Sequence, residues 1–293
     1  MWSAGSIRLA SQSFHGTGTR QRDEALYTES LHGRGRMAKF IEWCNAHEAR
    51  VGSHALRVLS ADPARINVGV QNAAAIVPMH YASEERLARI LERLGKPEAA
   101  GFIQNLLPTT KSIRSGDLGE ILATEFIAEQ TNYLIPIKRL RWKDHRNMAM
   151  RGDDVIGISE NRNGQVEFLK VEVKSRIALN AGVLSEARTA LDKDGGLPSA
   201  HALSFISSRL AEMGSARLAD LIDDAQLKHG ISAHSVRHLM FTFSANAPNV
   251  LLTASLNGYA GPIGQWGAGI VVREHAAFVA GVYNQVIFNA NNR

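Results

Sequence analysis

Residues 155–175, with the sequence VIGISENRNGQVEFLKVEVKS, constrain the fold of this chain more than any other segment. Two stretches rich in Val, Ile and Phe flank the polar stretch ENRNGQ. That stretch contains an Asn-Gly pair, which favours a tight turn between antiparallel strands. The pattern therefore predicts a β-hairpin, and the fold of the chain has to accommodate it.

Charged residues gather at one end of this predicted hairpin. Side chains alternate along a strand, so Glu172 and Lys174 project from the same face of the second strand. Asp154 lies at the head of the first strand, and we expect the three side chains to meet. Asp153 is an alternative to Asp154, because a shift of one residue in register changes which of them faces the site.

Phosphodiester hydrolysis is one chemistry that such a group can perform. It needs a divalent metal ion held by carboxylates, and it is helped by a nearby cation that positions water. Asp154, Glu172 and Lys174 supply these groups, and Mg²⁺ prefers oxygen ligands. The alternative is a solvated face on an edge strand, where charged side chains are common.

The segment before the hairpin, residues 115–133, predicts a helix with apolar residues at 118, 121, 122 and 126. It carries Glu120, a candidate third carboxylate. Asp117 and Glu120 also have the spacing of a capping box, in which Asp117 would cap the helix and Glu120 would have no catalytic role. The sequence leaves both interpretations open.

Residues 135–151, IPIKRLRWKDHRNMAMR, form a basic segment that leads directly to the acidic pair. The net charge of the chain is +5, and this segment has one acidic residue, Asp144. A positively charged segment next to the acidic residues would attract a polyanion such as DNA. The alternative is a solvated basic loop without a ligand. Trp142 would either stack on a base or anchor the loop to the core. The candidate DNA-binding residues are Lys138, Arg139, Arg141, Lys143, Arg146 and Arg151.

Three regions follow from the pattern along the chain. Residues 1–36 are expected to be a weakly ordered extension. Residues 37–108 predict a smaller N-terminal α+β region, with a strand over 65–77 and a helix over 83–96 that Ser83 caps. Residues 109–293 predict a helix, the hairpin, further helices, two strands near 236–245 and 267–274, and a closing helix over 275–290. The fold class expected is α/β, with a mixed sheet flanked by helices.

Several other classes of protein and site are disfavoured. The sequence contains no apolar run long enough to span a bilayer and no apolar core of a secretory signal, so we expect a cytoplasmic protein without membrane contact. Cys44 is the one cysteine, and we expect it to pack within a helix. His234 and His238 have the spacing of a helical metal pair but lack the glutamate of a zinc hydrolase motif.

The arrangement of Asp154, Glu172 and Lys174 resembles the PD-(D/E)xK nuclease superfamily, which has a restriction-endonuclease-like fold. Glu120 matches the acid that the superfamily often places on the preceding helix. The proline that usually precedes the aspartate is absent. The resemblance implies that Asp154, Glu172 and Glu120 hold Mg²⁺, with Mn²⁺ as a substitute, and that Lys174 acts on the attacking water.

The segments SGDLGEIL, IKRLRWK, NMAMRGDDVIGI, VEVKS and VRHLMFTF together resemble the HamA/AbpA family over residues 109–290. This resemblance implies a DNA nuclease subunit of a Hachiman-type anti-phage defence system, regulated by a superfamily 2 helicase subunit (HamB-like). A second hypothesis is a catalytically silent adaptor with a nuclease-like fold, which binds DNA and anchors the helicase. The apolar segment 249–272 favours the adaptor, and the intact set of two acids and a lysine favours the enzyme.

Overall fold

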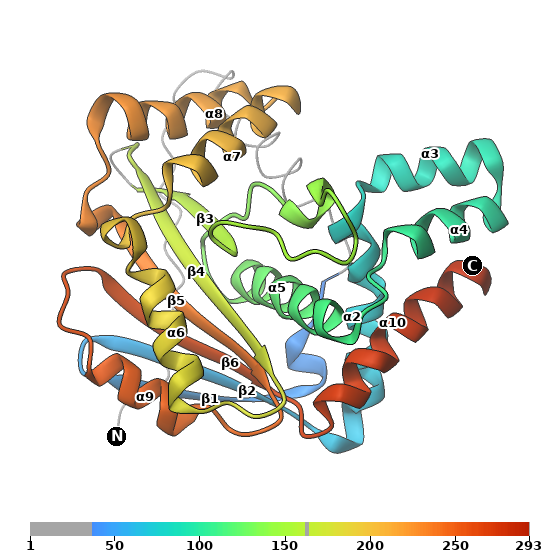
Figure 1. The fold of residues 1–293 in the computed structure, drawn as a ribbon, viewed down its shortest axis with the longest axis horizontal. Helices are drawn as coiled ribbons and strands as arrows, with labels where there is room; N and C mark the ends of the chain where they lie inside the picture. The colour runs from blue at the N-terminus through green and yellow to red at the C-terminus, as the bar shows by residue number, and fades with distance from the viewer. Residues whose placement is uncertain (1–36, 162–163, 293) are drawn as a thin grey trace, which may run out of the picture. The chain divides into compact units, whose positions relative to one another are not determined.

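A computed structural model describes residues 37–161 and 164–292 of the chain (Figure 1). The extension expected over residues 1–36 lies outside the described residues. These described residues belong to one compact unit. Within the described residues, no helix is both long and apolar enough to cross a lipid bilayer.

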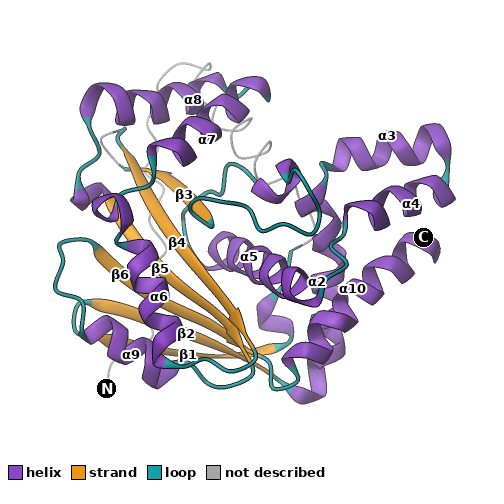
Figure 2. Ribbon diagram, in the orientation of Figure 1, coloured by secondary structure: helices purple, strands orange, loops and turns teal. Residues whose placement is uncertain are grey.

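A six-stranded mixed sheet forms the centre of this unit, with helices on both sides (Figure 2). Its strands lie in the order β1-β2-β6-β5-β4-β3. The two outer pairs, β1 with β2 and β3 with β4, are antiparallel, and the inner pairs are parallel. The strands are β1 (Cys44–Val51), β2 (His54–Ala61), β3 (Val155–Glu160), β4 (Val166–Arg176), β5 (Val236–Ser244) and β6 (Gly264–Val271).

Two groups of helices cover the sheet. Helices α2 (Ile66–Tyr81), α5 (Lys111–Gln130) and α10 (His275–Asn292) pack together over the larger hydrophobic core. Helices α6 (Ala181–Leu191) and α9 (Asn249–Asn257) cover the other face, over a smaller core. The remaining α-helices are α3 (Glu84–Leu94), α4 (Lys96–Leu106), α7 (Ala200–Glu212) and α8 (Ala216–Asp223), the last continued by a π-helix, η5 (Asp224–His229).

The α/β fold class and the predicted hairpin are confirmed. Strands β3 and β4 pair over Val155–Glu160 and Val166–Val171, and Gly164 in the turn has a φ of 77°. The helix predicted after Ser83 is α3, and the Ser83 hydroxyl accepts a hydrogen bond from the Arg86 amide, as a cap should. Helix α5 buries all four predicted apolar positions, which are at most 3% exposed: Leu118, Ile121, Leu122 and Phe126.

Two local predictions are wrong. Residues 65–77 were expected as a strand, but from Ile66 onward they lie in helix α2, which buries Ala73, Ala74, Ile76 and Val77. Cys44 was expected in a helix and begins strand β1, where it is buried. In both segments the apolar residues follow one another so closely that they fit the repeat of a helix as well as that of a strand. Packing against the rest of the protein then decides which of the two forms.

Residues 37–108, predicted as a separate smaller region, share the central sheet with the rest of the unit. Strand β2 pairs in parallel with β6 from Ala55 to Ser60. The fully buried ring of Trp43 stacks on Phe278 of α10 at 5.5 Å between centroids. The first and last segments of the described unit therefore complete one core.

Candidate active site

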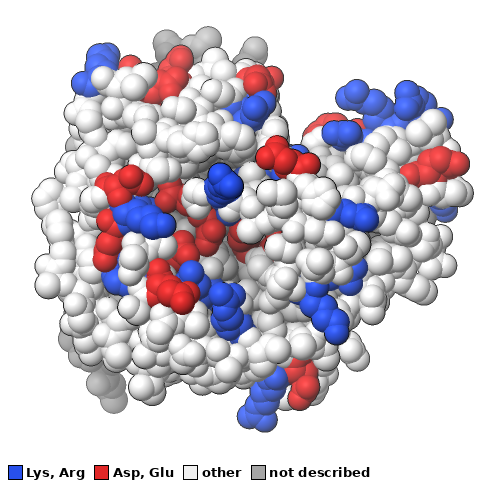
Figure 3. All heavy atoms as spheres, viewed as in Figure 1, with Lys and Arg blue, Asp and Glu red and all other residues white. Residues whose placement is uncertain are grey.

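Two paired strands and one helix bring the predicted acidic residues together. Val155 pairs with Val171, so the residue before Val155 lies beside the residue after Val171. That register places Asp154 beside Glu172 at the point where β3 begins. Glu120 reaches the same region from α5. Figure 3 shows acidic atoms recessed in a hollow between α5 and β4, with Lys and Arg side chains around it.

Asp154 is held to the edge of β4 by its own carboxylate. Strand β4 continues to Arg176, beyond the last residue that pairs with β3. The Val173 amide on this unpaired edge donates to Asp154 Oδ2 at 2.8 Å. A backbone donor thereby fixes the orientation of the carboxylate next to Glu172.

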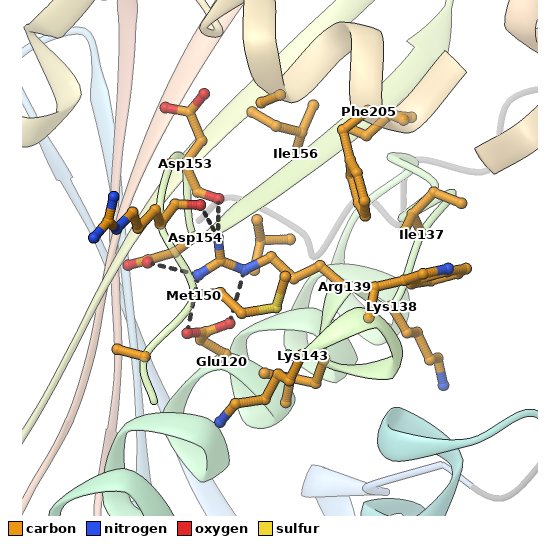
Figure 4. A pocket seen from close by; sticks show the side chains of 18 of the residues that line it. Glu120, Ile137, Lys138, Arg139, Lys143, Met150, Asp153, Asp154, Ile156 and Phe205 are labelled. Atoms are coloured by element: carbon orange, nitrogen blue, oxygen red, sulfur yellow. Dashed lines mark hydrogen bonds and ion pairs between the residues drawn. The ribbon is translucent and has the colours of Figure 1, made fainter. Parts of the chain in front are cut away.

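The guanidinium of Arg139 lies between Glu120 and Asp154 (Figure 4). Its Nε donates to Glu120 Oε2 at 3.0 Å, and its Nη2 donates to both Glu120 Oε1 at 3.1 Å and Asp154 Oδ1 at 3.2 Å. Its Nη1 donates to the Asp153 carbonyl at 2.7 Å. The Arg139 side chain is 13% exposed. A largely buried cation thus joins two of the three predicted metal ligands.

Glu172 and Lys174 form an ion pair on one face of β4, as predicted from strand alternation. Lys174 Nζ is 2.9 Å from Glu172 Oε1, and both side chains are about one-sixth exposed. This pair lies directly after the stretch of β4 that β3 covers. The two charged side chains thus lie on the part of β4 that no residue of β3 pairs with.

Burial raises the pKa values of all three carboxylates. Burial raises the pKa of Glu120 to about 7, with Arg139 acting in the opposite direction. Burial and then repulsion from Asp154 raise the pKa of Glu172 to about 7, and Lys174 opposes them. Burial also raises the pKa of Asp154. Carboxylates crowded in a poorly solvated region favour a bound cation, and perturbed groups of this kind concentrate at functional sites.

Asp153 and Asp154, which the sequence left as alternatives, point to different partners. The carboxylate of Asp153 turns away from Glu120 (Figure 4) and accepts from the Ser199 amide and hydroxyl, each at 2.9 Å. The buried ammonium of Lys170 lies 3.6 Å from it. Asp154 is therefore the acid that shares a partner with Glu120, and Asp153 holds the start of α7. Nothing in the sequence indicated this role for Lys170.

The structure decides between the two interpretations of Glu120 that the sequence left open, and it excludes the capping box. Helix α5 begins at Lys111 after Thr110, so Asp117 lies inside it. Asp117 is buried and accepts hydrogen bonds from Lys143 Nζ at 2.7 and 2.9 Å and from the Tyr81 hydroxyl at 2.7 Å. Glu120 is thus not explained by a capping box and stays a candidate ligand.

Most of the basic segment is engaged inside the protein. Lys138 lies 3.4 Å from Glu125, Arg141 donates twice to the Met79 carbonyl, and Lys143 pairs with Asp117. Arg146 is half-buried and Arg151 is exposed. The basic pattern of the sequence marks these six cations, but it does not show that Arg139, Arg141 and Lys143 turn inward, because their partners come from distant segments. Their contact with DNA stays a prediction.

A cavity of about 480 Å³ adjoins the Arg139 guanidinium. Its wall includes Glu120, Arg139 and Asp154 together with apolar and aromatic side chains. Trp142 packs edge-on against Phe205 of α7 in this wall, with ring centroids 5.9 Å apart. The site therefore has space on one side into which a side chain or a substrate group can enter.

The other candidate residues lie outside this site. His238 is buried in β5 and hydrogen-bonds the Gly196 carbonyl at 2.7 Å, whereas His234 lies in a short 3-10 helix before that strand. They do not share the helix that a metal pair at this spacing requires. Burial raises the pKa of the Cys44 thiol to about 12, which suits packing rather than nucleophilic attack.

The carboxylates match Mg²⁺ in chemistry but not in their present arrangement. Carboxylate oxygens are the ligands that Mg²⁺ prefers. Within residues 37–161 and 164–292, no group of three or more His, Cys, Asp or Glu side chains is arranged to hold a metal ion. The position between Glu120 and Asp154 is instead taken by the Arg139 guanidinium.

Comparison with known proteins gives two matches. The model of the HamA family matches residues 38–286. A Bacillus cereus protein named Hachiman protein HamA is 25% identical over 206 residues, which cover 69% of this chain and 73% of the relative. The sequence motifs predicted similarity over residues 109–290. The family match begins at residue 38, so it also includes the N-terminal region.

Proposed function

The chain belongs to the HamA family, and on that premise we propose that it is a metal-dependent deoxyribonuclease of a Hachiman anti-phage defence system. The observation that carries the proposal is the meeting of Asp154, Glu172 and Lys174 at the open edge of β4, with Glu120 joined to Asp154 through Arg139. An adaptor would have no use for this set of partly buried charges, whose burial costs free energy. The same set supports membership of the PD-(D/E)xK nucleases.

Each residue has a proposed role. Glu120, Asp154 and Glu172 would hold Mg²⁺, with Mn²⁺ as a substitute. When bound, such an ion supplies positive charge near the scissile phosphate and lowers the pKa of a coordinated water. Lys174, 2.9 Å from Glu172, would orient the attacking water and stabilise negative charge on the phosphate. The Val173 amide keeps Asp154 in place during this chemistry.

Basic residues at the rim would bind the DNA backbone. Arg151 is exposed and lines the cavity beside the site, and Lys138 lines the same cavity. Contacts to phosphate position DNA without reading its sequence, so we expect cleavage of low sequence specificity. Such a nuclease would damage host DNA. We therefore propose that a superfamily 2 helicase partner controls its activity, in line with the Hachiman name of the Bacillus cereus relative.

The test is degradation of plasmid and linear DNA with Mg²⁺ or Mn²⁺, by the full chain alone and with the partner helicase and ATP. We expect Glu172→Gln and Lys174→Met to lower the cleavage rate at least about 100-fold, the scale of losing a group that acts on the reacting water. Glu167→Gln, on the same strand but in the stretch that β3 covers, is the matched control and should cut normally. Circular dichroism and pull-down of the helicase should be unchanged in all three variants.

Two results would contradict the proposal. The first is a folded wild-type protein that cuts no DNA under any of these conditions. The second is normal cleavage by both Glu172→Gln and Lys174→Met. Either result would favour the adaptor, which binds DNA and anchors the helicase without hydrolysis.

A further inference from the structure

The position of Arg139 indicates how the proposed metal site is controlled. This inference rests on the proposed function. All four carboxylate oxygens of Glu120 and Asp154 already accept a hydrogen bond within the protein. Three of these bonds come from the Arg139 guanidinium, and the fourth comes from the Val173 amide. A metal ion that uses these carboxylates therefore has to compete with Arg139.

The contacts of Arg139 are those of a strong internal ligand. Its Nε and Nη2 donate one hydrogen bond to each oxygen of Glu120, in the bidentate geometry that makes arginine–carboxylate pairs strong. Its Nη1 is fixed by the Asp153 carbonyl at 2.7 Å. The guanidinium is always charged, so it compensates the two acids over the whole physiological pH range.

The surroundings of Arg139 also provide a place for it to go. The cavity of about 480 Å³ is lined by Arg139 itself and by Trp142 and Phe205. Aromatic rings attract guanidinium groups, and the Arg209 guanidinium already lies 6.0 Å from the Trp142 ring centroid and 5.5 Å from that of Phe205. The cavity wall also includes the carboxylate of Asp144, so it offers space and an acidic group to a displaced Arg139 side chain.

We propose that Arg139 is an internal competitor for the metal ion, occupying the cation position between Glu120 and Asp154. The metal-loaded site then forms only when the Arg139 side chain turns into the adjoining cavity. Any contact that draws Arg139 out, such as a DNA phosphate, would favour metal binding. The protein without such a contact would accordingly bind divalent ions weakly.

The experiment is direct titration of the metal-stripped full chain with Mn²⁺, followed by the EPR signal of free Mn²⁺, which needs no enzymatic activity. We expect Arg139→Gln to bind Mn²⁺ at least about tenfold more tightly than wild type, because the charge-assisted bonds that oppose the ion are removed. Arg65→Gln is the matched control, since it removes an arginine bonded to Asp62 at 2.9 Å on another part of the surface. Its Mn²⁺ affinity should equal that of wild type.

A second variant keeps the test valid if Arg139→Gln fails to fold. Arg139→Lys retains a positive charge but loses the fork that spans Glu120 and Asp154, so it should also bind Mn²⁺ more tightly than wild type. Thermal unfolding with and without Mn²⁺ gives an independent readout. The Mn²⁺-induced rise in Tm should be larger in either variant than in wild type, because a tighter ligand stabilises the fold more.

The outcomes separate this inference from the proposed function. If wild type and both Arg139 variants bind Mn²⁺ equally, and Asp154→Asn abolishes the binding, the metal site stands and the competition is overturned. If no variant binds Mn²⁺ in a manner that depends on Asp154 or Glu172, the proposed metal site itself fails. Tighter binding in the Arg139 variants that Asp154→Asn removes supports the inference.

Discussion

At the scale of single residues, the described part of this protein buries ionisable groups and pairs them across distant segments. Lys143 and Asp117 form an ion pair in which each side chain is 5% exposed. Glu125 of α5 is buried as well, and it lies 2.9 Å from the imidazole of His80 on α2 and 3.4 Å from the ammonium of Lys138. Buried charges of this kind are expensive unless they are paired, so each partner depends strongly on the other.

His80 makes the stability of the protein dependent on pH. Burial lowers the pKa of His80 to about 4, against an ordinary value of 6.5. The unfolded state therefore binds more protons than the folded state between these values, and stability is lost as the pH falls through this window. For this residue alone we expect a loss of about 2 kcal/mol between pH 7 and pH 5.

Urea unfolding of wild type and His80→Gln at a series of pH values measures this effect. Gln can still donate to Glu125 but does not titrate, so its unfolding free energy should fall less steeply as the pH is lowered. Parallel pH profiles for the two proteins would show that His80 is not the titrating group.

At the scale of elements, the closeness of α5 to β4 positions Glu120. An added Cβ at Gly119 would lie 3.0 Å from Ser175 Cβ and 3.2 Å from Val173 Cγ1, both on β4. The glycine therefore allows the helix to approach the strand that carries Glu172 and Lys174. The next residue on α5 is Glu120, so this approach sets how far its carboxylate reaches.

We expect Gly119→Ala to destabilise the protein by about 1–3 kcal/mol, the usual cost of overpacking. Gly116→Ala is the control in the same helix, because an added Cβ there meets nothing within 4 Å. It should be neutral or stabilising by up to about 1 kcal/mol, since alanine favours the helix over glycine. Unfolding midpoints in urea report both changes, and equal stabilities of the two variants would show that α5 has room to move away from β4.

At the scale of the whole described unit, the sheet depends on strands from both ends of residues 37–293. Strand β2 covers one edge of β6, and Trp43, Ile76 and Val77 belong to the core that α5 and α10 complete. The segment 37–108 thus packs in the same hydrophobic core as α5, the helix that carries Glu120. Its removal would expose a parallel strand edge and a large apolar face.

We expect a chain of residues 109–293 to lack a cooperative thermal transition and to bind the dye ANS, as proteins without fixed packing do. A chain of residues 37–293 is the control and should melt in one sharp transition. Differential scanning calorimetry compares the two chains. A sharp transition of residues 109–293 at the temperature of the longer chain would show that the N-terminal strands are dispensable for the fold.

The sequence by itself determined the elements whose signals are local. The Asn-Gly turn between apolar strands predicted the hairpin, and strand alternation placed Glu172 and Lys174 on one face, because both patterns are set by backbone geometry within a few residues. The same reasoning failed for α2, where packing overrode a pattern that fits two periods. The catalytic roles of the candidate residues stay predictions.

Only the tertiary structure decided which charged groups face one another. Asp154 rather than Asp153 shares a partner with Glu120, and Arg139 lies between those two acids instead of on the surface. Lys143 likewise turns inward to Asp117. These partners come from segments far apart in the chain. A long basic side chain turns toward whichever buried acid lies within its reach, and the packing of helices and strands decides which acid that is.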